Sequence, residues 1–251
     1  MRNGTGQIDE TFIQIYHEAR GVGRAARIFC APNLVPAPGQ YLLAHAPSEP
    51  GDPLPHPVFL AASHPRGFYA ASPLPVAWVP GTQLTLRGPL GRGFHLPASA
   101  RRVALAAFGG NPSRLLALLE PALAQKAEIT LLAETAPDNL PPAIEILPLA
   151  ALAETTKWAD YLAMDAPRAA LAAIQETFLP DSPAAFSGHT TNSGPKHLPA
   201  FNLIDYATEI LVETPLPCGG IAECGVCAIQ SRRETLLACK DGPVFDLKSI
   251  L

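Results

Sequence analysis

Residues 218–227 read CGGIAECGVC, and one further cysteine follows at position 239. These four thiols have the spacing C-x5-C-x2-C-x11-C, and they are four of only five cysteines in the chain. A disulfide framework would spread its cysteines through the fold, whereas thiols crowded at one end indicate a metal or cluster site. We therefore expect Cys218, Cys224, Cys227 and Cys239 to be metal ligands.

The spacing favours a [2Fe-2S] cluster over zinc. Plant-type clusters use C-x4-C-x2-C with a distant fourth cysteine, and this chain has one residue more in the first interval. Gly219, Gly220 and Gly225 lie between the ligands, where glycine lets backbone N–H groups approach cluster sulfurs. A structural zinc ribbon usually offers two C-x2-C pairs, and only one is present here, but zinc stays the alternative.

Outside this segment, composition excludes several classes of protein. The chain has 251 residues, of which 48% are hydrophobic and 16% charged, so it can bury a sizeable core. The net charge of −4, without a basic block, argues against nucleic-acid binding. No apolar run approaches the roughly 20 residues of a membrane span, and the N-terminus lacks a signal-peptide pattern. We expect a cytoplasmic protein without membrane contact.

The first hundred residues predict short β-strands about 10 residues apart. That spacing is typical of an antiparallel barrel or sandwich. The candidate strands cover residues 11–17, 26–30, 40–44, 58–62, 67–70, 76–79 and 83–87.

The middle of the chain predicts a doubly wound α/β layer. Apolar runs at residues 102–107 and 127–133 have the character of buried parallel strands. A helical pattern opens at Asn111-Pro112 between them, and proline suits the first turn of a helix. Further strands are expected at 144–147, 161–164 and 209–213, which gives the strand–helix alternation of this fold class.

Three domains follow from these patterns. We expect a β-barrel domain over residues 1–98, an α/β domain over 99–212 and a cluster-binding module over 213–251. No internal repeat is present.

Three motifs resemble a known family. Cys239-Lys-Asp-Gly-Pro-Val-Phe245 resembles the CKDGPVF ending of the electron-transfer subunit of dihydroorotate dehydrogenase B. Gly88-Pro-Leu-Gly-Arg-Gly-Phe94 is similar to the family's GPLGNGF, and Gly39-Gln-Tyr41 to its GQF. The motifs occur in the family's order over nearly the whole chain. The resemblance implies a ferredoxin-reductase-like flavin barrel, a nicotinamide-type α/β domain and a [2Fe-2S] module.

The flavin site implied by the resemblance departs from the family pattern. The family has an Arg-Pro-x-Ser strand where this chain has His56-Pro57-Val58-Phe59, so a fixed charge and a hydroxyl are replaced. The phosphate loop that follows is shortened after Phe68, Tyr69 and Ala70. If FAD binds, the resemblance places it at these seven residues, and we expect it to be absent or substoichiometric.

The nicotinamide signature is also weakened. The family's GGGxGxxP turn is reduced to Gly109-Gly110-Asn111-Pro112, which we interpret as an ordinary strand-to-helix turn. Asp165 stands where relatives have a cysteine close to the nicotinamide, and a carboxylate repels phosphate. We expect binding of NAD(H) to be weak or absent.

The resemblance implies an electron-transfer subunit in pyrimidine biosynthesis. It would relay electrons through a [2Fe-2S] cluster, and through FAD if present, to or from an FMN-containing dihydroorotate dehydrogenase catalytic subunit in a heteromer. We assign no catalytic residue of its own to the chain. Two alternatives stay open: a regulatory or binding subunit stabilised by a cluster or zinc, and a reductase component of another pathway.

Overall fold

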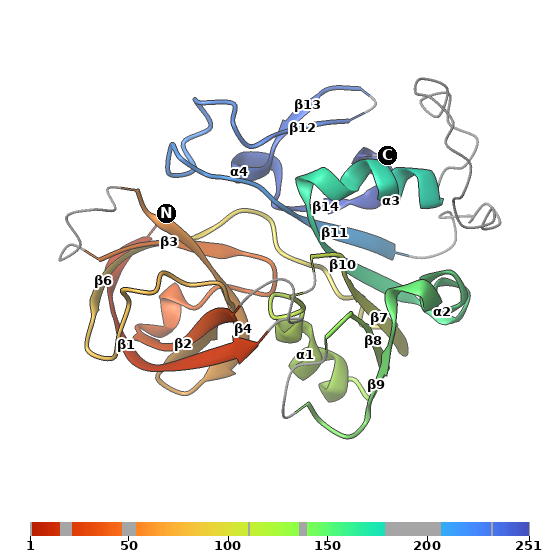
Figure 1. The fold of residues 1–251 in the computed structure, drawn as a ribbon, viewed down its shortest axis with the longest axis horizontal. Coiled ribbons are helices and arrows are strands. Elements are labelled where there is room, and N and C mark those ends of the chain that lie inside the picture. Colours follow the sequence, from red (N-terminus) through yellow and green to blue (C-terminus); the bar gives the residue numbers. More distant parts are fainter. Residues whose placement is uncertain are drawn as a thin grey trace.

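The N-terminal part of the chain closes into a six-stranded antiparallel barrel in the computed structural model (Figure 1). Its strands follow the order β1-β2-β5-β4-β3-β6, and β6 pairs back onto β1. The structure describes residues 2–15, 22–46, 54–109, 111–135, 140–178, 207–231 and 233–250. The barrel strands are β1 (Arg2–Ile15), β2 (Val22–Cys30), β3 (Tyr41–His45), β4 (His56–His64), β5 (Gly67–Ala70) and β6 (Gln83–Leu90).

Six of the seven expected strands overlap a strand of the barrel, but the one expected at residues 76–79 is wrong. These residues form a turn and coil after Pro75, and Trp78 is buried in the barrel core with 1% of its surface exposed. A short apolar run between two prolines thus supplies a core side chain without pairing in the sheet. Positions 16–17 of the first expected strand lie outside the described residues.

The central part forms a mainly parallel sheet with helices on both faces, which confirms the doubly wound prediction. The sheet order is β14-β11-β10-β7-β8-β9. The first apolar runs become β7 (Arg102–Ala107) and β8 (Glu128–Leu132). The remaining parallel strands are β9 (Ile144–Leu147), β10 (Tyr161–Pro167) and β11 (Ala207–Glu213), and the helices are α1 (Leu119–Ala124), α2 (Leu152–Trp158) and α3 (Leu171–Phe178).

The two faces of β7 enter different cores. Val103 and Leu105 pack with the α1 side, whereas Ala104 and Ala106 pack with α2, α3 and the C-terminal segment. Single-turn 3-10 helices precede α1, α2 and α3, at Leu116–Leu118, Leu149–Ala151 and Arg168–Ala170, and another lies at Pro32–Leu34. No helix in the described part of the chain is both long and apolar enough to span a membrane.

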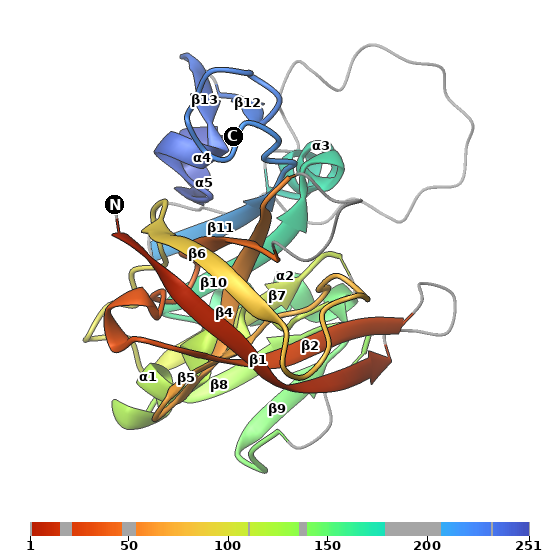
Figure 2. The same cartoon turned by 90° about the vertical axis from the view of Figure 1, so that its left-hand side faces the viewer.

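The C-terminal segment returns to the α/β sheet. It contains the hairpin β12 (Ala228–Gln230) and β13 (Thr235–Leu237), followed by α4 (Ala238–Asp241), β14 (Val244–Asp246) and α5 (Leu247–Ile250). β14 pairs antiparallel with β11, so the last residues form an edge strand of the central sheet. Figure 2 shows the hairpin and α4 beyond β11. The pairing of β14 with β11 joins the segment to the sheet across the expected domain boundary at residue 213. That boundary stays a prediction.

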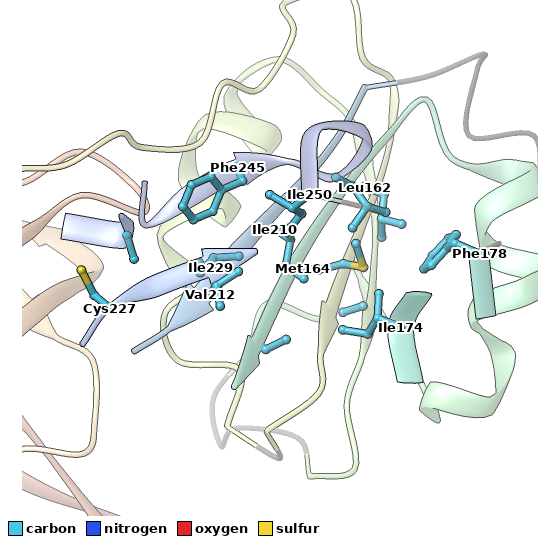
Figure 3. Packing of buried hydrophobic residues seen from close by; sticks show 14 of the residues in the cluster. Leu162, Met164, Ile174, Phe178, Ile210, Val212, Cys227, Ile229, Phe245 and Ile250 are labelled. Atoms are coloured by element: carbon cyan, nitrogen blue, oxygen red, sulfur yellow. The ribbon is translucent and has the colours of Figure 1, made fainter. Parts of the chain in front are cut away.

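Side chains from the C-terminal segment share one apolar core with the sheet. Figure 3 shows Ile229 and Phe245 beside Val212 and Ile210, with Met164 further along the same face. Tyr41 and Leu43 of β3 belong to this same core, whereas Leu42 and Ala44 face the barrel interior. Strand β3 is therefore buried on both sides, which places the barrel wall against the cysteine segment.

The motifs that suggested the family meet in space. Arg92 donates its backbone N–H to the carbonyl of Gly242, and it forms a bridge with Pro243. Gln40 donates its side-chain amide to the carbonyl of Gly91, and the distance is 3.1 Å. Gly39, Gly91 and Gly242 therefore lie at the junction of barrel, sheet and cysteine segment, although they are far apart in sequence.

Replacing Gly91 with alanine tests this junction. Gly91 has a φ of +73°, and an added Cβ would lie 2.6 Å from Pro243 Cδ and 2.7 Å from the carbonyl oxygen of Gly242. Gly81 is the matched control, because its φ is +91° but an added Cβ meets nothing within 4 Å. We expect Gly81→Ala to lower the free energy of unfolding by about 1–2 kcal/mol through backbone strain alone. Gly91→Ala should cost about 1–3 kcal/mol more through overpacking.

Urea denaturation of both variants measures this difference. Equal losses for Gly91→Ala and Gly81→Ala would show that the junction does not depend on close approach of the two backbones.

Candidate metal centre

The four cysteines of the C-terminal segment lie on a loop and a short helix. Cys218 and Cys224 lie on the loop between β11 and β12, Cys227 comes directly before β12, and Cys239 lies in α4. Cys227 and Cys239 are buried, with 1% and 6% of their surfaces exposed. Cys218 is half-buried and Cys224 is exposed. The structure thus gives the site one buried side and one that faces solvent.

The thiols form two pairs. Cys218 interacts with the side chain of Cys224, and Cys239 with that of Cys227. Within the described ranges, no three His, Cys, Asp or Glu side chains are grouped so as to hold a metal ion. The described thiols therefore stand as two pairs and not as one closed four-thiol site.

Backbone N–H groups surround the outer thiol. Desolvation would raise the pKa of Cys218, but hydrogen bonds from the Cys224 side chain and from the N–H groups of Cys224, Ile221 and Glu223 lower it to about 6. Burial and the neighbouring Cys227 raise the pKa of Cys239 to about 12. A thiolate that accepts several backbone N–H groups suits an anionic metal–sulfur centre.

Glycines make this loop possible. Gly219, Gly220 and Gly225 all have positive φ angles, of 63°, 75° and 69°. L-residues with a Cβ rarely adopt that conformation, so the interleaved glycines let the loop turn around the thiols. The role expected from the sequence, that these glycines let backbone N–H groups approach cluster sulfurs, stays a prediction.

Further contacts fix the inner pair. Ala238 donates its backbone N–H to the carbonyl of Cys227 at 3.1 Å, which ties the two inner cysteines together. Asp241 accepts the backbone N–H of Leu237 at 2.8 Å and thereby fixes the turn that carries Cys239. Arg168, at the end of β10, donates to the carbonyl of Val226 at 2.8 Å. The thiols are thus held by the barrel, the sheet and their own hairpin.

The seven residues that the resemblance assigned to flavin lie in different environments. Val58, Phe68 and Ala70 are fully buried and pack in the barrel core. His56 packs edge-on against Trp78 at 5.6 Å between ring centroids, and Tyr69 packs against His64 at the same distance. Pro57 and Phe59 are half-buried on β4. The flavin assignment of these residues stays a prediction.

A buried ion cluster lies beside Phe59. Arg114 donates to both carboxylate oxygens of Asp165, at 2.7 and 2.9 Å, and to Glu213 at 3.0 Å. Its guanidinium carbon lies 5.6 Å from the centre of the Phe59 ring. Burial raises the pKa of Asp165, whereas Arg114 opposes that shift. Desolvation also acts on Glu213, but Arg114 holds its pKa below the ordinary value.

The turn after β7 also contacts the barrel directly. Asn111 donates its side-chain amide to the carbonyl of Ser72 at 2.8 Å, and the Ser113 hydroxyl donates to the same oxygen at 3.3 Å. Gly109 begins this turn, whereas Gly110 lies outside the described residues. The loop that would have to cradle phosphate is therefore bonded to the barrel loop after β5.

These contacts test how well the junction suits a flavin or dinucleotide. Phe59, Arg114 and Asp165 meet where the resemblance places the altered ring and nicotinamide contacts, and they contact one another. Arg114 was not identified from the sequence. One feature of the sequence does point to a partner such as Arg114: Asp165 stands in an apolar strand, and a buried carboxylate requires a cation beside it.

Replacing Arg114 with methionine should strongly destabilise the protein. The change leaves Asp165 buried without its partner, and breaking a buried pair in this way costs about 3–5 kcal/mol. Arg102→Met is the control, because Arg102 forms an exposed pair with Asp160 and such pairs contribute little. Chemical denaturation compares the two free energies of unfolding. Similar losses for both variants would contradict a structural role of the buried cluster.

Comparison with known proteins agrees with this geometry. Residues 217–251 match the model of the iron–sulfur cluster binding domain of dihydroorotate dehydrogenase B, and all four cysteines lie inside that range. No curated protein matches the chain.

Solved structures show the fold of the whole chain. An NADH-dependent reduced ferredoxin-NADP oxidoreductase, described in connection with flavin-based electron bifurcation, aligns over 98% of this chain and 89% of its own. Its TM-score is 0.69, with 16% identity. The ferredoxin reductase of carbazole 1,9a-dioxygenase covers 70% of this chain and 64% of its own, with a TM-score of 0.52 and 18% identity. The FAD apo form of the same reductase covers 71% of this chain and 63% of its own, with a TM-score of 0.52 and 16% identity.

The resemblance that the sequence motifs suggested is confirmed on two levels, the C-terminal domain and the fold. The chain carries an iron–sulfur cluster-binding domain of the dihydroorotate dehydrogenase B type on a ferredoxin-reductase-like barrel and α/β sheet.

Proposed function

We propose that the chain is an electron-transfer subunit whose four C-terminal cysteines hold a [2Fe-2S] cluster. The carrying observation is that the four thiols lie on one glycine-rich loop and the short helix after its hairpin, where Cys218 interacts with Cys224 and Cys227 with Cys239. A [2Fe-2S] cluster takes four cysteine thiolates, two for each of its two irons, so this donor set suits it. When bound, the cluster would accept and release single electrons.

The chain's own residues would bind, shield and orient that group. Cys227 and Cys239 are buried, which excludes water from one side, whereas the exposed Cys224 leaves the other side open to a redox partner. Ile221 and Val226 on the same loop are 51% and 41% exposed. Apolar side chains around an exposed ligand support a partner that covers this loop.

We propose as that partner an FMN-containing dihydroorotate dehydrogenase catalytic subunit, in a heteromer that serves pyrimidine biosynthesis. The support is the match of residues 217–251 to the domain of that enzyme class. Co-purification with such a subunit, and reduction of the cluster by dihydroorotate only in its presence, test the pairing. A cluster that is reduced equally well without it would refute this partner.

The contacts of Arg114 with Phe59 and Asp165, between the barrel and the sheet, favour electron transfer through the cluster with little or no bound flavin. Phe59 and Arg114 lie together where relatives are expected to place the ring, and no step here is assigned to FAD or NAD(H). This observation also supports the second candidate, a cluster-bearing subunit that has lost both nucleotide sites. Visible spectra of the purified protein distinguish a flavin-bearing relay from that candidate.

Replacing cysteines tests the cluster directly. Cys227→Ser should abolish the red-brown colour of anaerobically purified protein, because it removes one of four thiolate ligands. Cys30→Ser is the control: Cys30 is half-buried and far from the other cysteines in sequence, and desolvation raises the pKa of its thiol to about 11, so it is a poor thiolate ligand. Iron, sulfide and zinc analysis provides the measurement. Zinc without iron in the unmodified protein would refute the proposed cluster.

A second variant tests the flavin prediction. The unmodified protein should contain substoichiometric FAD or none, because a lost charge-assisted contact costs about 1.5–3 kcal/mol of binding. The double variant His56→Arg, Phe59→Ser should contain more FAD, measured by absorbance after denaturation. His64→Arg on the same strand adds the charge elsewhere and should not. Stoichiometric FAD in the unmodified protein would restore a flavin–cluster relay.

A further inference from the structure

The barrel wall places two polar side chains beside the cysteine loop. Tyr41 of β3 is fully buried and lies outside the barrel interior, in the core that also contains Cys227 and Cys239. Its hydroxyl donates to the carbonyl oxygen of Cys239 at 3.4 Å. Arg87 lies on β6, the neighbouring strand of the barrel. Neither residue is proposed as a cluster ligand, and the sequence named Tyr41 only as part of the Gly39-Gln-Tyr41 motif.

The cysteine loop fits closely around these two side chains. A Cβ added to Gly220 would lie 3.1 Å from the Tyr41 hydroxyl oxygen, and one added to Gly219 would lie 3.2 Å from Arg87 Nη2. Leu43 Cδ1 lies 3.6 Å from the Cβ position of Gly220 and 4.0 Å from that of Gly219. The backbone between Cys218 and Cys224 therefore rests directly on the barrel wall.

The same groups are linked electrostatically. Burial raises the pKa of the Tyr41 hydroxyl, the charges of Cys239, Cys227 and Cys218 raise it further, and Arg87 opposes the shift. The Tyr41 hydroxyl is fully buried and donates to a backbone carbonyl of the cysteine segment, so it acts there as a hydrogen-bonding dipole.

We propose that Tyr41 and Arg87 are positioning residues that raise the reduction potential of the cluster, an inference that rests on the proposed ligation by the four cysteines. Reduction adds one negative charge to the cluster. The Arg87 guanidinium beside Gly219 stabilises that charge, and the Tyr41 hydroxyl offsets the negative end of the Cys239 carbonyl by donating to it. The local field of hydrogen bonds and charges sets the potential of such clusters. The barrel thereby has a redox role that requires no flavin.

The experiment compares reduction potentials of cluster-loaded variants. Tyr41→Phe removes the hydroxyl and Arg87→Gln removes the charge, and each should weaken reduction about tenfold, which is about 59 mV for a one-electron couple. Tyr69→Phe and Lys126→Gln are matched controls. The Tyr69 hydroxyl is bonded to Arg27, and Lys126 is an exposed side chain after α1 on the α/β sheet. Redox titration followed by electron paramagnetic resonance gives the potentials.

Arg87→Lys keeps the positive charge. Comparing it with Arg87→Gln tests the effect of that charge on the reduction potential, even if Tyr41→Phe does not load a cluster. The proposal is supported if Arg87→Lys has a reduction potential close to that of the unmodified protein while Arg87→Gln has a clearly lower one. Loaded Arg87→Gln with an unchanged potential overturns it. Absence of iron from the unmodified protein refutes the proposed function itself, which distinguishes that failure from failure of the tuning.

Discussion

The close contact between Gly91-Arg92 and Gly242-Pro243 is the constraint on which the rest of the structure depends. An added Cβ at Gly91 would lie within 2.7 Å of both partners, so the two backbones touch without side chains between them. This contact fixes the end of the barrel against the residues that follow Cys239. From there the chain enters β14 and pairs with β11. This single backbone contact therefore fixes the positions of the barrel, the sheet and the cysteine segment relative to one another.

A second, charged junction holds the barrel against the sheet at the carboxyl ends of β10 and β11, where Val212 also donates its backbone N–H to the carbonyl of Pro243. Arg114 bonds to Asp165 and Glu213, at the ends of these strands, and lies over the ring of Phe59 on the barrel. Arg114 and Asp165 are both buried and require each other, since each alone would carry an uncompensated charge, whereas Glu213 is half exposed to solvent. We interpret the junction as structural.

The cysteine segment connects these features to electron transfer. It packs on the outer side of β3, whose inner side fills the barrel, so this strand is shared by two cores. Tyr41 and Arg87 reach the loop from that wall. In this arrangement the barrel supplies a rigid, partly polar surface beside the thiols. The function of such a fold is decided by the side chains at its site and not by the fold itself.

The sequence by itself determined the α/β strands and the antiparallel strands of the first hundred residues, and it predicted the four thiols as the donor set. Cysteine spacing, apolar runs and turn residues are local signals, and the family motifs at Gly88–Phe94 and Cys239–Phe245 gave the order of the parts. Only the tertiary structure decided that Val76–Val79 is a turn that buries Trp78, that the thiols pair in twos, and that Arg114 neutralises Asp165. These results depend on contacts between residues far apart in the chain. Periodicity and spacing carry no information about such contacts, because they record neighbours along the sequence rather than neighbours in space.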